Sequence, residues 1–194
     1  DTNSFAYLAL GDSYTIGQSV DEKDRFPVQL LDRLFPNNLE NKEVKIIART
    51  GWRTDQLQTA IDADTELKSK YDLVSLLIGV NNQYQGGDIE IYKVEFRALL
   101  EKAISLAGND KTKVFVVSIP DYAYTPFGNG NTAISQEIDA YNAINKEITE
   151  SLNITYHDIT PISREGLNDP TLVADDNLHP SGKQYTKWVE VIMD

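Results

Sequence analysis

The chain has 194 residues, of which 41% are hydrophobic and 25% charged, as expected for one globular domain over residues 1–194 with a single sizeable core. Its formal net charge is −12, from 30 acidic and 18 basic residues, and no run of Lys or Arg forms a stripe that could follow a phosphate backbone, which excludes nucleic acid as an expected partner. No apolar stretch approaches the roughly 20 residues that a spanning helix needs, so no membrane span is expected.

Five short apolar runs, rich in β-branched and aromatic residues, predict five strands. They cover residues 5–10, 44–48, 73–78, 113–119 and 154–159. Segments with helical spacing lie between and after them, over residues 27–35, 54–67, 89–107, 134–152 and 180–192. Strand and helix therefore alternate along the chain, which is typical of a parallel sheet with helical crossover connections.

The third and fourth predicted strands contain the runs LVSLLI and VFVVSI, which are continuously apolar rather than alternating. Such strands need helices on both faces of the sheet. We therefore predict an α/β fold, a three-layer α/β/α sandwich with a five-stranded parallel sheet, whose ligand crevice lies beyond the carboxyl ends of the strands. The longest irregular segment, residues 121–132, follows the fourth strand and should rim this crevice.

The turn after the first strand reads LGDSY, and Ser13 stands in it at the expected start of a helix. The preceding glycine lets the backbone turn sharply. A serine hydroxyl needs a base to act as a nucleophile, and an N–H at a helix start can face a developing oxyanion. Ser13 is therefore a candidate nucleophile, and its alternative role is a simple helix N-cap.

Near the carboxyl end, the segment DDNLHPSG places His179 directly before a proline. The proline keeps His179 out of the helical region, and Pro180 suits the first position of the final helix. Asp176, three residues earlier, is close enough to hold the imidazole in one tautomer, while Asp175 is a competing carboxylate with a less natural spacing. The alternative is a surface histidine beside carboxylates that cap the helix.

The chain has two histidines and no cysteine. The other histidine, His157, falls inside the predicted fifth strand, where we expect a structural role. The absence of cysteine excludes disulfides, thiolate metal ligands and a cysteine nucleophile. Two histidines argue against a zinc site and the carboxylates show no calcium-loop spacing, so we predict no metal and no cofactor.

Two further segments follow predicted strands and should reach the same edge of the sheet. Gly51 follows the second strand and could present its backbone N–H to an oxyanion. Asn81 follows the third strand and could donate from its side-chain amide. The alternatives are a plain turn residue at Gly51 and Asx turns formed by Asn81 or Asn82.

In chain order, these segments make the sequence resemble the SGNH hydrolases, the family of GDSL-type esterases and lipases. The blocks of that family read GDS near the amino terminus, a glycine in the second block, GxND in the third and DxxH near the carboxyl end. They correspond here to residues 11–13, Gly51, residues 79–82 and residues 176–179, within a resemblance that spans about residues 5–190. Four such blocks in order, each beside its expected strand or helix, are specific.

The resemblance implies a flavodoxin-like fold and a catalytic triad. Ser13 would be the nucleophile, His179 the general base and then acid, and Asp176 the residue that orients His179. The oxyanion would be held by the N–H groups of Ser13 and Gly51 and by the Asn81 side chain. One departure is that Asn82 stands where the family often has aspartate, which puts the local turn around Asn81 in question.

We therefore expect a serine hydrolase that cleaves carboxylic esters through an acyl-enzyme. Aromatic side chains on the crevice loops could stack on a sugar or line a short acyl pocket, with ordinary loop packing as the alternative: Trp52, Tyr84, Tyr122, Tyr124 and Phe127. No lid insertion for a long acyl chain is visible, which favours small-molecule esters such as acetylated carbohydrate.

Two kinds of alternative function stay open at this point. A thioesterase, a lysophospholipase or an acyltransferase would use the same triad, whereas a flavodoxin-like binding module would have no chemistry at all. The sequence begins at Asp1 rather than Met, which favours an exported protein whose leader has been removed, with a cytoplasmic protein as the alternative.

Overall fold

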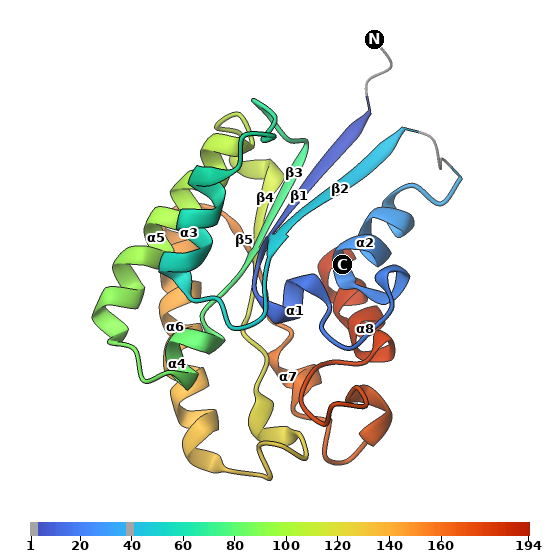
Figure 1. Ribbon diagram of the computed structural model, residues 1–194, viewed down its shortest axis with the longest axis vertical. Helices are drawn as coiled ribbons and strands as arrows, with labels where there is room; N and C mark the ends of the chain where they lie inside the picture. The colour runs from blue at the N-terminus through green and yellow to red at the C-terminus, as the bar shows by residue number, and fades with distance from the viewer. Residues whose placement is uncertain (1–3, 38–40) are drawn as a thin grey trace.

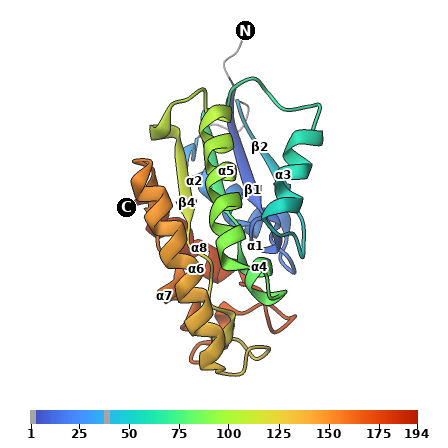
Figure 2. The same ribbon diagram turned by 90° about the vertical axis from the view of Figure 1, so that its left-hand side faces the viewer.

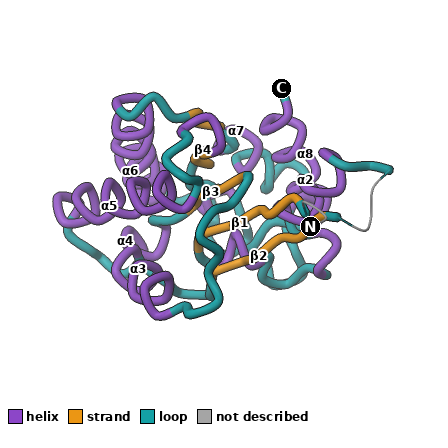
Figure 3. Tube along the Cα trace, turned by 90° about the horizontal axis from the view of Figure 1, so that it is seen from above, coloured by secondary structure: helices purple, strands orange, loops and turns teal. Residues whose placement is uncertain are grey.

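The computed structural model describes residues 4–37 and 41–194. Its sheet has five parallel strands in the order β2-β1-β3-β4-β5, and Figure 3 shows the sheet between two layers of helices. The strands are β1 (Phe5–Gly11), β2 (Lys42–Ala48), β3 (Leu73–Leu77), β4 (Val114–Val117) and β5 (Thr155–His157). The predicted three-layer α/β/α sandwich with a five-stranded parallel sheet is confirmed.

Helices cover both faces of the sheet (Figure 1). One layer contains α3 (Thr54–Ala63), α4 (Val80–Tyr84), α5 (Ile89–Leu106) and α6 (Thr132–Ser151), and Figure 2 shows α5 and α6 side by side in front of the sheet. The other layer contains α1 (Ser13–Ile16), α2 (Phe26–Leu34), α7 (Thr160–Ser163) and α8 (Gly182–Met193). Short 3₁₀ turns lie at Glu22–Asp24, Lys111–Lys113, Tyr122–Tyr124 and Pro170–Leu172.

The buried core accounts for the apolar sequence patterns of the strands and helices, as β1 and α8 show. Residues Tyr7 to Leu10 of β1 have no exposed surface, because β1 lies inside the sheet and is covered on both faces. On α8, Tyr185, Trp188 and Val189 are equally buried, and their i, i+3, i+4 spacing forms the apolar stripe that packs this helix on the sheet.

The register brings three strands to a common end. Gly11 at the end of β1 is paired with Ala48 of β2 on one side and with Leu77 of β3 on the other. The loops after these three strands therefore begin at the same level of the sheet. This edge is where the sequence predicted the ligand crevice.

Several element boundaries differ from the sequence prediction, and for two of them the structure gives a reason. The fourth strand ends at Val117, because the backbone of Ile119 is bonded to the side chain of Asn142, with N–H to Oδ1 at 2.7 Å and Nδ2 to the Ile119 carbonyl at 2.9 Å. The last helix begins at Gly182 with Ser181 as its N-cap, so the prediction of Pro180 at the first helical position is wrong. Pro180 instead forms an isolated antiparallel bridge with Val173.

None of the helices within residues 4–37 and 41–194 combines the length and apolar character needed to cross a membrane.

Candidate active site

A cavity of about 320 Å³ opens at the common end of β1, β2 and β3. Four residues singled out in the sequence for chemistry line it: Ser13, Gly51, Asn81 and His179. Most of the remaining lining is apolar or aromatic, with Tyr14, Val80, Tyr84, Tyr122, Phe127 and Leu178, and the polar Thr50 and Gln85 complete it. Residues from both ends of the chain thus meet at one opening.

Ser13 is the first residue of α1, and its side chain does not cap that helix. The N-cap is Asp12, whose Oδ1 accepts a hydrogen bond from the Tyr14 N–H at 3.0 Å. Gly11 is required just before it, because a Cβ there would lie 2.5 Å from the Leu77 carbonyl oxygen. The interpretation of Ser13 as a mere N-cap is therefore wrong, and Ser13 lines the cavity.

Asp12 itself is completely buried. Burial raises the pKa of its carboxyl to about 7, against the lowering effect of hydrogen bonds from backbone groups of the turn. Its Oδ2 atom is buried and has no hydrogen-bond partner among the described residues. A carboxyl in this state adds little negative charge beside Ser13 below neutral pH.

His179 and Asp176 are paired on one loop. His179 Nδ1 lies 2.6 Å from Asp176 Oδ2, while Asp176 Oδ1 accepts the backbone N–H groups of Leu178 and His179, both at 2.9 Å. Partial burial works to raise the pKa of Asp176, but hydrogen bonds from Ser19, His179 and Leu178 outweigh it and lower that pKa to about 2. Asp176 is therefore ionised at neutral pH and can accept a hydrogen bond from the Nδ1–H group of His179.

The competing carboxylate, Asp175, is turned elsewhere. Asp175 is exposed and lines a separate groove that also contains Asp21 and Asp24. Asn177 adopts a left-handed backbone with φ of 65° in the turn between Asp176 and His179, and the Asp176 carboxylate lies against the His179 ring. The structure thus selects Asp176 as the partner of the imidazole.

The imidazole is fixed by packing as well as by Asp176. The His179 ring is buried and lies 5.6 Å from the Tyr14 ring, measured between centroids. The Tyr14 backbone carbonyl accepts a hydrogen bond from the Tyr185 hydroxyl at 2.8 Å. The residue after Ser13 is thereby tied to α8 and to the loop that precedes it.

Gly51 lines the cavity from the loop after β2, and Asn81 lines it from the first turn of α4. Gly51 has a φ of 85°, and a Cβ on it would meet nothing within 4 Å, so the backbone conformation and not crowding requires glycine here. The Asn81 side chain donates from Nδ2 to the Trp52 carbonyl at 2.9 Å. This partner is 29 residues away, so Asn81 does not form the local Asx turn considered as its alternative.

Asn82 explains the departure from the third family block. Its side chain is buried and bonds to Thr54 at the start of α3, accepting from the backbone N–H at 3.2 Å and donating to Oγ1 at 2.7 Å. The Thr54 hydroxyl in turn donates to the carboxylate of Glu95. Because that hydroxyl hydrogen is already used, Thr54 Oγ1 needs a donor, which asparagine supplies and an aspartate carboxylate would not.

Three of the five predicted aromatic side chains reach the cavity. Tyr84, Tyr122 and Phe127 line it, with ring centroids between 6.1 and 6.3 Å apart. The structure does not bring the other two there. Trp52 packs against the core and contributes only its carbonyl to Asn81, and the Tyr124 ring lies 6.0 Å from the Arg164 guanidinium carbon.

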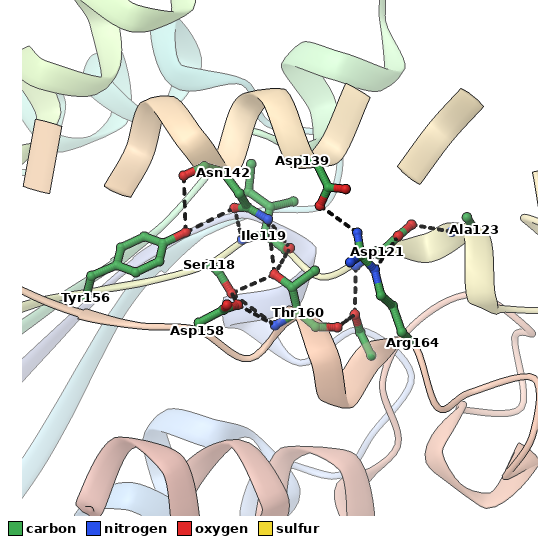
Figure 4. A network of polar contacts seen from close by, with 11 residues as sticks. Ser118, Ile119, Asp121, Ala123, Asp139, Asn142, Tyr156, Asp158, Thr160 and Arg164 are labelled. Atoms are coloured by element: carbon green, nitrogen blue, oxygen red, sulfur yellow. Dashed lines mark hydrogen bonds and ion pairs between the residues drawn. The ribbon is translucent and has the colours of Figure 1, made fainter. Parts of the chain in front are cut away.

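A polar network holds the loop that carries Tyr122 and Phe127 (Figure 4). Asp121 is fully buried, and its Oδ2 accepts from Arg164 Nε at 2.9 Å while its Oδ1 accepts from the Ala123 N–H at 3.0 Å. Arg164 also donates to Asp139 on α6 at 2.6 Å. Arg164 could not be found from a local sequence pattern, because its partners lie 43 and 25 residues away.

The same loop touches the segment that carries the histidine. The Phe127 N–H donates to the Asn177 carbonyl at 3.0 Å, and the Tyr122 hydroxyl donates to Gln83 Oε1 at 3.0 Å. Gln83 Nε2 donates to Glu137 at 2.5 Å. The aromatic wall of the cavity is therefore bonded both to the 176–179 loop and to α4.

The described part of the chain has no group of three or more His, Asp or Glu side chains placed to hold a metal ion. His157, the second histidine, lies in β5 with its ring 5.4 Å from the Phe115 ring. Burial lowers its pKa. The site is thus built from a hydroxyl, an imidazole, a carboxylate and amide donors.

Comparison with known proteins places this geometry in context. The model of the GDSL-like lipase/acylhydrolase family matches residues 9–187, while none of the curated proteins matches the chain. Among solved structures, the acetylxylan esterase Axe2 from Geobacillus stearothermophilus is 19% identical, with a TM-score of 0.72 over 100% of this chain and 95% of that one. The lipase Lip_vut3 from a goat rumen metagenome is 18% identical, with a TM-score of 0.77 over 98% and 96%.

A lipase/acylhydrolase from Enterococcus faecalis is similar to the same degree. It is 20% identical, with a TM-score of 0.71 over 97% of this chain and 93% of that chain. At these identities the likenesses establish a shared fold.

Proposed function

Because the chain belongs to the GDSL-like lipase/acylhydrolase family, we propose that it hydrolyses carboxylic esters through an acyl-enzyme formed on Ser13. The observation that carries this proposal is the pairing of His179 with Asp176 at 2.6 Å, on the cavity that also exposes Ser13. The three residue types are those that activate a hydroxyl for attack on a carbonyl.

In the proposed reaction, His179 Nε2 takes the Ser13 proton as the Ser13 oxygen attacks the carbonyl carbon. Asp176 keeps Nδ1 protonated and stabilises the imidazolium that forms. The tetrahedral intermediate collapses, the ester C–O bond breaks, and the alcohol leaves with the proton from His179. Water then attacks the acyl-enzyme with His179 as base, and the acid and free Ser13 are released.

The developing oxyanion is held by the N–H groups of Ser13 and Gly51 and by the Asn81 amide. Asn81 Nδ2 carries two hydrogens, and the bond to the Trp52 carbonyl uses one of them. The other is available to the cavity that Asn81 lines. Preorganised donors of this kind stabilise the charge that appears in the transition state, with about 3 kcal/mol for one donor.

The proposed substrates are small or short-acyl esters, such as acetylated carbohydrate. A cavity of about 320 Å³ walled by Tyr84, Tyr122 and Phe127 offers flat apolar faces beside Ser13, which suit a short acyl group or the face of a sugar ring. Axe2, which shares the fold, is an acetylxylan esterase, and a variant of it with one serine replaced by alanine is a catalytic mutant.

A substrate panel tests this proposal. We expect purified protein to hydrolyse p-nitrophenyl acetate faster than the octanoate and palmitate esters, and to release acetate from acetylated xylo-oligosaccharides. Thioester and lysophospholipid substrates form the comparison arm, because the same triad would serve a thioesterase or lysophospholipase. Preference for long acyl chains or for thioesters would contradict the short-ester assignment, and no hydrolysis of any of them would contradict the proposed chemistry.

A further inference from the structure

The turn that follows α1 holds an unusual residue. Helix α1 ends at Ile16, its C-cap Gly17 has a φ of 71°, and Ser19 two residues later has a φ of 67°. Glycine adopts this left-handed conformation without strain, whereas a serine there is uncommon. Ser19 is exposed, so packing in the core does not explain why its backbone is held in this way.

The Ser19 side chain reaches the candidate triad. Its Oγ donates to Asp176 Oδ2 at 2.6 Å, across 157 residues of sequence. This is the same oxygen that lies 2.6 Å from His179 Nδ1. Among the described residues, the other hydrogen bonds to this carboxylate come from its own loop, from the N–H groups of Leu178 and His179.

The same turn also contacts Ser13 and the Gly51 loop. The Gln18 N–H donates to the Ser13 carbonyl at 3.0 Å, and Gln18 Oε1 accepts from the Thr50 hydroxyl at 2.6 Å. Residues 17–19 therefore join the helix of Ser13, the loop before Gly51 and the loop of Asp176. Of these contacts, only the one made by Ser19 involves the carboxylate of Asp176.

We propose that Ser19 is a positioning residue of the catalytic triad, which fixes the Asp176 carboxylate, and through it the His179 ring, relative to the helix that carries Ser13. This inference rests on the proposed function. The Asp176 side chain is 29% exposed, so without Ser19 water would take the vacant lone pair and the carboxylate could rotate away from the imidazole. A strained backbone kept at an exposed position that aims a hydroxyl at this carboxylate fits such a role.

Three substitutions at this position separate the hydroxyl from the backbone. Ser19→Ala removes the donor and keeps the Cβ, Ser19→Gly removes the donor and relieves the left-handed strain, and Ser19→Asn restores a donor on a residue that tolerates this conformation. With p-nitrophenyl acetate, we expect kcat to fall about three- to tenfold in the first two variants while KM stays within about twofold. Ser19→Asn should recover most of the loss.

A resting-state measurement reports the contact without any turnover. The Nδ1 proton of a histidine bonded to a carboxylate gives a low-field proton NMR signal, and the chain has only two histidines. We expect this His179 signal to shift or broaden in Ser19→Ala, and to stay in place in Gln18→Ala, a change in the same turn that does not touch Asp176.

Different results would overturn the role of Ser19 and the proposed function. Wild-type kcat in both Ser19→Ala and Ser19→Gly, or an unmoved His179 signal in Ser19→Ala, would overturn the role of Ser19. A third outcome would also overturn it. In that outcome Ser19→Ala loses kcat, its Tm shows that the loss comes from unfolded protein, and Ser19→Gly is fully active. If Ser13→Ala kept its turnover, the proposed function would fail, yet the NMR signal would still report whether Ser19 holds Asp176.

Discussion

The side-chain amide of Asn81 donates to the backbone carbonyl of Trp52 at 2.9 Å, which fixes one hydrogen of that amide and orients the other. The link joins the loop after β2 to α4, which follows β3, at the edge of the sheet where these two strands end. Two segments proposed to form the oxyanion hole are thereby held to each other before any substrate arrives. Such preorganisation is what makes donors effective in a transition state.

Replacing Asn81 should therefore slow the chemical step. We expect Asn81→Ala to lower kcat with p-nitrophenyl acetate by about 10²- to 10³-fold, with little change in KM, because the donor acts on charge that exists only in the transition state. Steady-state kinetics of the folded variant measure this. An equal fall in kcat/KM that comes from a higher KM, with kcat unchanged, would show that Asn81 binds the substrate in the ground state instead.

Two adjacent aspartates offer a matched pair of variants. Asp176→Asn removes the charge beside His179 and disturbs its tautomer, so we expect kcat to fall about 10³- to 10⁴-fold. Asp175→Asn, one residue earlier on an exposed carboxylate, should leave kcat within about twofold. Comparable losses in the two variants would contradict the selection of Asp176.

Asp12 should make stability depend on pH. Its folded-state pKa is about 7, against an ordinary value of 3.8. Between these values the folded protein keeps a proton that the unfolded chain has released, so the free energy of unfolding falls as pH rises from about 4 to 7 and stays lower above 7. The side chain in Asp12→Asn cannot ionise, so this variant lacks the part of the pH dependence that comes from position 12.

The measurement is urea unfolding of wild type and Asp12→Asn at pH 5 and pH 8. We expect the variant to gain stability relative to wild type on going to pH 8, by on the order of a few kcal/mol. Comparing the difference between the two proteins at each pH cancels the other titrating groups. A difference that is the same at both pH values would show that Asp12 does not carry this pH dependence.

The Arg164–Asp121 pair should support the aromatic wall. Arg164→Gln leaves Asp121 buried without its cation, and because the Arg164 side chain is 32% exposed, we expect a loss of about 1–3 kcal/mol in unfolding free energy rather than the full cost of a buried pair. KM should also rise, since Tyr122 and Phe127 follow Asp121. Lys187→Gln, which breaks the exposed pair with Glu165, is the control and should change stability by less than about 0.5 kcal/mol.

The sheet and its longer helices could be predicted from sequence because each of these elements follows from a local pattern, whereas the short helices α4 and α7 were not predicted. The buried runs that became β3 and β4 are apolar throughout, and the stripe on α8 repeats with helical spacing. Boundaries were less accurate where side chains from distant segments intervene. Asn142 ends β4, and the bridge between Val173 and Pro180 delays the start of α8.

The loops that line the cavity could be predicted from the positions of the strand ends, since loops after parallel strands meet at one edge of the sheet. The direction of individual side chains on these loops could not be predicted. Trp52 and Tyr124 stand on the expected loops, yet one packs on the core and the other faces Arg164. Ser19 had no local signal either, because its partner, Asp176, is 157 residues away.

Covalent labelling distinguishes an activated nucleophile at Ser13 from an ordinary serine hydroxyl. A fluorophosphonate should react with the native protein in a one-to-one ratio, and peptide mass spectrometry should locate the added mass on Ser13. The reaction should be lost in Ser13→Ala and strongly slowed in Asp176→Asn. Absence of labelling in the folded wild-type protein, or labelling that maps to another residue and survives Ser13→Ala, would show that Ser13 is not the nucleophile.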